Sequence, residues 1–311
     1  ILAGAPAAAS LKPSDGATIV IDCHAHLHHH GNANYAEKDR QLIEAADKLG
    51  IDRLCCSILT PVRPATADGF RECNRWLAEA AARFSGRVWS YCYVNPEHGK
   101  EAVDEIRRCV DERGFIGVKL YNEHVCTEAV VAPVVEAAIE LRVPILHHAG
   151  HAHYPLPGQP NISDGGHLAE LGRRYPEARL ICAHVGGGGD WEWTIKALDA
   201  GLPVLCEKPF TVSASQARDV VAEAKRRGLL VAEAFMYRFH PIYDQLHELI
   251  RTGVIGELLC IKSVFAFRLT DRSNIRCSAE LAGGALMDVG CYCVNLARRI
   301  TGCEPETAQA F

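Results

Sequence analysis

Residues 18–26 read TIVIDCHAH, and this stretch decides the fold. Its first four residues are β-branched and predict a strand, which ends in an Asp-Cys-His-Ala-His sequence. Successive side chains of a strand point to opposite faces, so His24 and His26 project to the same side. Two imidazoles placed in this way can hold one cation, and the stretch therefore predicts a strand that ends in a metal-binding pair.

The same alternation of a short apolar strand and an amphipathic helix continues along the chain. We expect strands at 18–26, 53–59, 88–94, 117–121, 144–148 and 179–184, and helices at 37–49, 70–84, 102–111, 130–141 and 166–175. Helical crossovers return the chain in the same direction, which indicates parallel pairing. Six such units predict an α/β fold of the TIM-barrel-like (β/α)8 type.

Polar side chains lie at the ends of these predicted strands, where a barrel carries its active site. Lys119 belongs to the fourth strand, His147 and His148 end the fifth, and His184 ends the sixth. Since neighbours on a strand face opposite ways, only one of His147 and His148 can point into the barrel. Neutral imidazoles suit a divalent cation such as zinc, and three or four of them leave room for a bound water.

Composition narrows the classes of function. The chain has 311 residues, 48% of them hydrophobic and 23% charged, with a net charge of −5. It contains no basic run that would bind nucleic acid and no apolar stretch long enough to cross a membrane. The 14 cysteines form no paired CxxC motif and indicate buried thiols in a reducing compartment. We therefore expect a small-molecule substrate, a globular protein that can form a homo-oligomer, and a cytoplasmic location.

The first residues leave a second location open. Residues 1–10 read ILAGAPAAAS, which fits the end of a signal peptide as well as a disordered lead-in. Residues 1–17 are accordingly expected to lie outside the fold, and export to the periplasm is the alternative to the cytoplasm.

Four stretches resemble the amidohydrolase superfamily, in its metal-dependent branch related to decarboxylases. They are IDCHAHL, GVKLY, PILHHAG and LICAHVGGGGDWEW, and the resemblance covers about residues 19–193. It implies a TIM barrel with a divalent metal, usually zinc, on His24, His26, His148 and His184, the last alternatively polarising substrate. Lys119 lies near the position at which some relatives carry a lysine that bridges two metals. A substrate-contacting or structural role is the alternative for Lys119. The family's aspartate at the end of strand eight has no match.

From about residue 192 the chain resembles a different family, the Gfo/Idh/MocA oxidoreductases of the dihydrodiol dehydrogenase type. The matching stretches are EWTIKALDAGLPVLCEKPF, GLLVAEAFMYRFHP, GVIGEL and GGALMDVGCYCVNLARRITG. The resemblance implies that the Glu207-Lys208-Pro209 turn lies beside a nicotinamide, that Asp288 and Tyr292 form an acid/base pair, and that Arg238 faces substrate. A surface lysine and a helix-capping aspartate are the alternatives for Lys208 and Asp288.

The oxidoreductase half lacks a clear site for NAD(P). A dinucleotide fold needs a G-x-G-x-x-G turn after its first strand, and residues 186–189 are four glycines without that spacing. The chain thus reads as a hydrolase front joined to an oxidoreductase back, with the seam at 190–194. A natural fusion, an engineered chimera and a misassembled sequence would all give this pattern.

We expect the second half to complete the barrel. Predicted strands at 203–206 and 229–234, with helices at 191–199 and 213–227, supply units seven and eight of a barrel domain over 18–240. Glu233 would then replace the missing aspartate. Residues 241–311 would form a partial oxidoreductase domain, a small α+β appendage with a helix, a hairpin or short sheet at 258–269, and a helix at 290–301.

The leading functional hypothesis is a metal-dependent hydrolase, or a decarboxylase of the same branch, acting on a small carbonyl, amide or lactone substrate. Its catalytic candidates are His184, Glu233 and Lys119. The first alternative is an NAD(P)-dependent oxidoreductase of a sugar or diol, using Lys208, Asp288 and Tyr292. The second is an inactive hybrid of two incomplete domains.

Overall fold

The computed structural model describes residues 19–149, 163–184, 192–239, 241–270, 272, 274–279 and 282–309. The chain divides into two compact units, and the boundary along the chain falls between residues 184 and 185. The first unit carries six strands and the five helices between them in the described chain, with all the candidate metal-binding histidines, and the second carries everything from residue 185 onward. Each unit is described separately below.

The first unit is built on one parallel sheet whose strands follow the order of the chain. Its strands are β1 (Ile21–His28), β2 (Arg53–Leu59), β3 (Val88–Tyr93), β4 (Gly117–Leu120), β5 (Ile145–His148) and β6 (Leu180–Ala183). Its helices are α1 (Tyr35–Lys48), α2 (Ala67–Arg83), α3 (Lys100–Arg113), α4 (Ala132–Glu140) and α5 (Gly165–Arg174). Each lies within three residues of the predicted ends, so the α/β alternation is confirmed.

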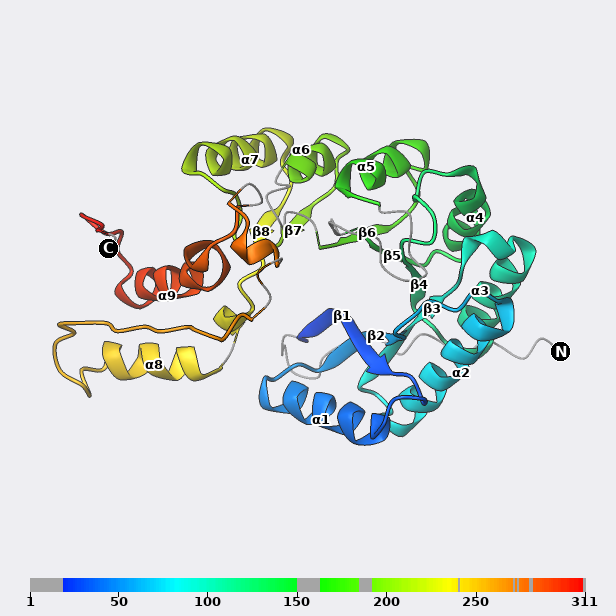
Figure 1. Cartoon of the computed structure of the whole chain (residues 1–311), viewed down its shortest axis with the longest axis horizontal. Coiled ribbons are helices and arrows are strands. Elements are labelled where there is room, and N and C mark those ends of the chain that lie inside the picture. The colour runs from blue at the N-terminus through cyan, green and yellow to red at the C-terminus, as the bar shows by residue number, and fades with distance from the viewer. Residues whose placement is uncertain are drawn as a thin grey trace. The chain divides into compact units, whose positions relative to one another are not determined.

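The sheet curls, and the helices cover its outer face (Figure 1). A large core fills the space between the strands and these helices; it includes Leu54, Phe70, Ile106 and Val118, each at most 1% exposed. The inner face holds a smaller cluster around Cys55, Tyr91, Leu146 and Ala183. Alternate residues of one strand thus supply two different cores, as the period of two requires.

Local signals in the sequence explain where the helices begin and end. Thr66 caps α2, since its Oγ1 accepts a hydrogen bond from the Gly69 amide at 3.2 Å. Asp164 forms a capping box with His167 at the start of α5. Gly114 ends α3 with a φ of +67°, a left-handed conformation that favours glycine.

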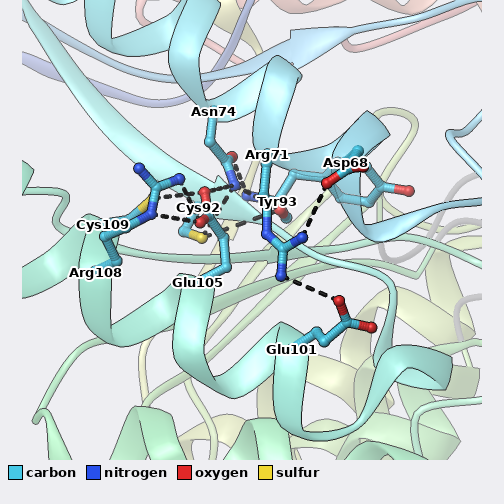
Figure 2. A network of polar contacts seen from close by, with 9 residues as sticks. All are labelled: Asp68, Arg71, Asn74, Cys92, Tyr93, Glu101, Glu105, Arg108 and Cys109. Carbon is cyan, nitrogen blue, oxygen red and sulfur yellow. Dashed lines mark hydrogen bonds and ion pairs between the residues drawn. The ribbon is translucent and has the colours of Figure 1, made fainter.

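A buried polar network ties α2 and α3 to β3 (Figure 2). The Asn74 side chain bonds both the amide and the carbonyl of Tyr93, each at 2.9 Å, and donates to Glu105 Oε1 at 3.0 Å. Arg108 and the Cys109 thiol also donate to the Glu105 carboxylate, at 2.5 Å and 3.3 Å. Glu105 and Asn74 are 2% and 1% exposed, so this network fixes two helices against the strand.

The second unit begins with two further α/β repeats. Its elements are α6 (Glu192–Asp199), β7 (Val204–Cys206), α7 (Ala214–Arg227), β8 (Val231–Glu233), α8 (Pro241–Arg251), a π-helical turn (Leu286–Gly290) and α9 (Cys291–Thr301). Ser213 caps α7, and its hydroxyl accepts a hydrogen bond from the Gln216 amide at 3.3 Å. Within the described ranges, no helix is long and apolar enough to cross a membrane.

Two sequence-based expectations about this unit are wrong. The strands β7 and β8 pair in parallel with each other, in a separate two-stranded sheet, and in the described chain neither pairs with β1 or β6. The sheet of the first unit is therefore a six-stranded half-barrel, not a closed (β/α)8 barrel. Residues 258–270 also form no hairpin; they run without regular secondary structure. Strands of three residues offer few hydrogen bonds, so their partners are set by the helices packed on them.

Candidate functional site: a histidine cluster at the strand ends

Four histidines from three strands lie side by side at the carboxyl end of the half-barrel. His24 and His26 belong to β1, His148 ends β5, and His184 directly follows β6. The ring centroids of His24 and His26 are 4.9 Å apart, those of His24 and His184 are 5.0 Å apart, and those of His148 and His184 are 4.6 Å apart. The structure therefore brings together all four residues that the sequence proposes as metal ligands.

Strand parity separates the two neighbouring histidines of β5. His148 lies beside the His184 ring, whereas His147 is 1% exposed and its Nδ1 bonds the His148 carbonyl at 2.9 Å. The His147 Nε2 is 3.5 Å from the Ser163 hydroxyl. Only His148 faces the cluster, as the period of two predicts.

Burial keeps these imidazoles neutral. Burial and then the nearby Lys119 lower the pKa of His24 to about 2, that of His26 to about 4 and that of His148 to about 3. The same two causes lower the pKa of His184. At neutral pH the rings therefore carry lone pairs, the form in which imidazole binds metals.

Lys119 lies in the middle of the cluster and is fully buried. Its Nζ is 3.3 Å from His24 Nε2 and 4.7 Å from the centroid of the Tyr121 ring. Burial, followed by the charge of Arg63, lowers the pKa of Lys119 to about 7. Its amine can therefore exchange a proton near neutral pH.

The donors fit a divalent cation in kind, and their arrangement needs adjustment to hold one. In the portion of the chain that the structure describes, no three His, Cys, Asp or Glu side chains converge as a ready-made metal site. The four rings lie within reach of one another, and the Lys119 amine occupies the space beside His24. Holding an ion would therefore require the rings to rotate and that amine to move.

A hydrogen-bonded chain orients one of these rings. The Ser57 hydroxyl is 3.0 Å from His26 Nδ1 and 3.1 Å from the Tyr121 hydroxyl. Because Ser57 occupies Nδ1, His26 has its Nε2 left for a ligand. Sequence reasoning missed Ser57, which belongs to no motif. It lies two residues after Cys55 and therefore on the same inner face of β2, and its contact with His26 is visible only once the strand pairing is known.

A second cluster lies in the other unit and gathers the oxidoreductase candidates. Lys208 Nζ donates to the Asp288 carbonyl at 2.6 Å and lies 3.2 Å from Asp288 Oδ1, and it is 5.1 Å from the Tyr292 ring centroid. Arg276 Nε donates to Asp288 Oδ2 at 2.6 Å. Burial acts to raise the pKa of Asp288, but the bonds from Arg276 and Lys208 outweigh it and hold that pKa below its usual value. The structure thus brings Lys208, Asp288 and Tyr292 together.

The remaining candidates from the sequence lie at or after the ends of β7 and β8 in the second unit. Glu207 and Pro209 flank Lys208 after β7, and Arg238 lies in a 3-10 turn after β8. Glu233 Oε1 accepts a hydrogen bond from the Phe210 amide at 2.8 Å. Since β8 does not pair in the six-stranded sheet, the strand position that suggested Glu233 as a catalytic carboxylate is not formed. The glycine run 186–189 lies outside the described residues.

Comparison with known families identifies both halves. The family model described as amidohydrolase matches residues 21–235, about two thirds of the chain, and the chain belongs to this family. A second model, the GFO/IDH/MocA C-terminal domain, matches residues 243–311. The two resemblances read from the sequence are thereby confirmed.

Curated relatives are oxidoreductases that share only part of the chain. D-xylose 1-dehydrogenase (NADP(+)) 2 of Haloferax volcanii is 45% identical over 112 residues, 36% of this chain and 34% of that protein. Trans-1,2-dihydrobenzene-1,2-diol dehydrogenase of Xenopus tropicalis is 33% identical over 117 residues, 37% of this chain and 35% of that protein. The chain therefore spans about a third of the length of these relatives.

Solved structures match the larger part of the chain. A 2,6-dihydroxybenzoate decarboxylase, complexed with 2,6-dihydroxybenzoate, has a TM-score of 0.52 at 14% identity, covering 73% of this chain and 93% of that one. A Staphylococcus aureus protein assigned to the amidohydrolases has a TM-score of 0.51 at 16% identity, covering 71% and 89%. At these identities the likeness establishes the fold.

Proposed function

We propose that the first unit is a metal-dependent enzyme of the amidohydrolase family, a hydrolase or decarboxylase of a small carbonyl compound. The observation that carries this proposal is the close grouping of four histidines from three strands beside a buried lysine. Family membership and the decarboxylase among the structural neighbours support it.

His24, His26 and His148 would hold the ion, with His184 as a fourth ligand or as a group that contacts substrate. When bound, a divalent ion such as zinc would polarise a substrate carbonyl and lower the pKa of a coordinated water. Ser57 orients the His26 ring, and the Lys119 amine, with a pKa near 7, holds or releases a proton at Nζ.

Metal binding tests this proposal directly. Chelator-treated protein is given zinc or manganese, and bound metal is counted by mass spectrometry while the melting temperature is recorded. We expect about one ion per chain and a higher melting temperature, because a ligand of the folded state stabilises it. The same treatment of H24A and H148A should give neither effect.

The exposed His247 of α8 provides the matched control, and H247A should bind metal as the parent protein does. Absence of bound metal and of a thermal shift in the parent protein would refute the proposal. Turnover is then sought with small carboxylic acids, amides and lactones. Cytoplasmic location and homo-oligomer formation remain predictions.

A second candidate function, an NAD(P)-dependent sugar or diol oxidoreductase, is favoured by the Lys208–Asp288–Tyr292 cluster and by the relatives of this type. Titration with NADPH, followed by its fluorescence, tests it. Absence of binding at millimolar nucleotide would remove this candidate. A hybrid without activity would show a broad melt and no response to metal or nucleotide.

A further inference from the structure

Arg63 is a buried cation whose hydrogen bonds are incomplete. It lies in the loop after β2, is 5% exposed, and donates from Nη2 to the Thr60 carbonyl at 2.6 Å. Its Nε and Nη1 are buried and have no hydrogen-bond partner in the described part of the chain. The Thr60 hydroxyl of the same loop is also buried without a hydrogen-bond partner in the described residues. A guanidinium stays charged at all working pH values, and burying its donors unpaired is costly.

The guanidinium lies one aromatic ring away from the histidine cluster. Arg63 Cζ is 4.0 Å from the Tyr121 ring centroid and 5.7 Å from that of Tyr93. The Tyr121 hydroxyl contacts Ser57, which contacts His26. The charge of Arg63 also lowers the pKa of both His26 and Lys119, so its field reaches the cluster.

Among the described residues, Glu123 is an acidic side chain that the charge of Arg63 reaches, and other groups engage it. Glu123 Oε1 accepts a hydrogen bond from the Tyr93 hydroxyl at 2.6 Å. Burial raises the pKa of Glu123, which weakens its capacity to compensate a cation. Lys119 Nζ and Arg63 Cζ both lie over the Tyr121 ring, at 4.7 Å and 4.0 Å from its centroid, so two basic side chains meet there.

We propose that Arg63, with the Thr60 hydroxyl, binds a carboxylate group of the substrate, so that the enzyme acts on carboxylic acids in preference to their neutral amides. A carboxylate supplies acceptors for the unpaired donors and offsets the buried charge. A single arginine with one hydroxyl suits a monoanion better than a phosphate dianion. This inference rests on the proposed function of the cluster as the reaction centre.

The test compares benzoate with benzamide, which have the same shape and differ in charge. Binding to chelator-treated protein is measured by calorimetry, so that no metal can hold the carboxylate. We expect benzoate to bind at least about tenfold more tightly than benzamide, the range of a charge-assisted hydrogen bond. In R63Q this preference should disappear, and in R63K, which keeps the charge, part of it should remain.

R113Q is the matched control. Arg113 ends α3, just before β4 begins, and therefore lies at the amino-terminal end of the strands, away from the histidines. Its Nη1 is likewise buried without a hydrogen-bond partner in the described chain. R113Q should keep the benzoate preference. A parent protein that binds benzoate no better than benzamide, or an R63Q variant that keeps the preference, would overturn the inference.

The zinc stoichiometry of R63Q separates this inference from the proposed function. We expect R63Q to bind zinc as the parent does, because Arg63 is not among the candidate ligands. Zinc binding with an unchanged benzoate preference in R63Q would refute the role of Arg63 and leave the proposed function standing. If R63Q loses the benzoate preference but the parent protein never binds zinc, the role of Arg63 stands and the proposed function is refuted.

Discussion

Replacing Asn74 with alanine should destabilise the first unit strongly, because one side chain joins a helix to two other elements. Asn74 is 1% exposed and makes four hydrogen bonds: two with the Tyr93 backbone, one with the Glu105 carboxylate, and a longer one, at 3.4 Å, to the Cys92 sulfur. N74A removes all four and leaves the partner atoms buried.

The expected loss follows from these bonds. Each bond to the Tyr93 backbone is worth about 1 kcal/mol, and the bond to the carboxylate about 2 kcal/mol. The sum, about 4 kcal/mol, is a large share of the 5–15 kcal/mol or so by which folded domains are stable. Loss of the side-chain volume adds to it.

Urea unfolding, followed by circular dichroism, measures this loss. The control is N32A, since Asn32 is only half-buried and its side chain accepts one hydrogen bond, from Lys38, at the exposed surface. N32A should change the unfolding free energy by less than about 0.5 kcal/mol. A loss below about 1 kcal/mol in N74A would contradict the reasoning, since it would mean that the Figure 2 network contributes little to stability.

Three further outcomes are expected. G117A should cost about 1–3 kcal/mol of unfolding free energy, because a Cβ there would lie 2.6 Å from the Pro144 carbonyl oxygen; an unchanged urea midpoint would contradict this. S57A should weaken zinc binding by about 10–100-fold while S57T retains it, because His26 loses the partner of its Nδ1; calorimetry with zinc decides, and equal affinities would contradict it. The unfolding free energy of metal-free protein should fall as pH drops from about 6.5 toward 4, because the folded-state pKa values of His24, His26 and His148 lie below the unfolded value, so the unfolded chain takes up protons first. The slope should be at most about 1.4 kcal/mol per pH unit for each histidine. A flat profile of unfolding free energy against pH in urea titrations would refute this expectation.

The sequence predicted the first unit well because its signals are local. Short apolar strands, amphipathic helices and glycines such as Gly114 act within a few residues, and their order alone implies a parallel sheet. The facing of His24 and His26 follows from strand geometry in the same way. Closure of the barrel depends on long-range pairing, and a strand such as β7, whose Leu205 is 60% exposed, carries no local signal for its partner.

The surroundings of the histidines were less predictable. Arg63 lies between two prolines, Pro61 and Pro64, in a loop without periodicity, and its unpaired donors become apparent only when all neighbours are placed. Ser57 lies inside an apolar strand and is recognised by its contact with His26. Satisfaction of a buried polar group is a property of three-dimensional surroundings, which residue spacing does not encode.

The extended run from residue 258 to 270 affects how the protein behaves at high concentration. Leu259 is 86% exposed, Val264 is 76% exposed, and Phe265 and Phe267 are about half exposed. Because this described run forms no strand pair, its backbone amides and carbonyls can pair with strands of other molecules, and bulky apolar side chains strengthen such a contact. We therefore expect self-association that grows with protein concentration and that V264K suppresses.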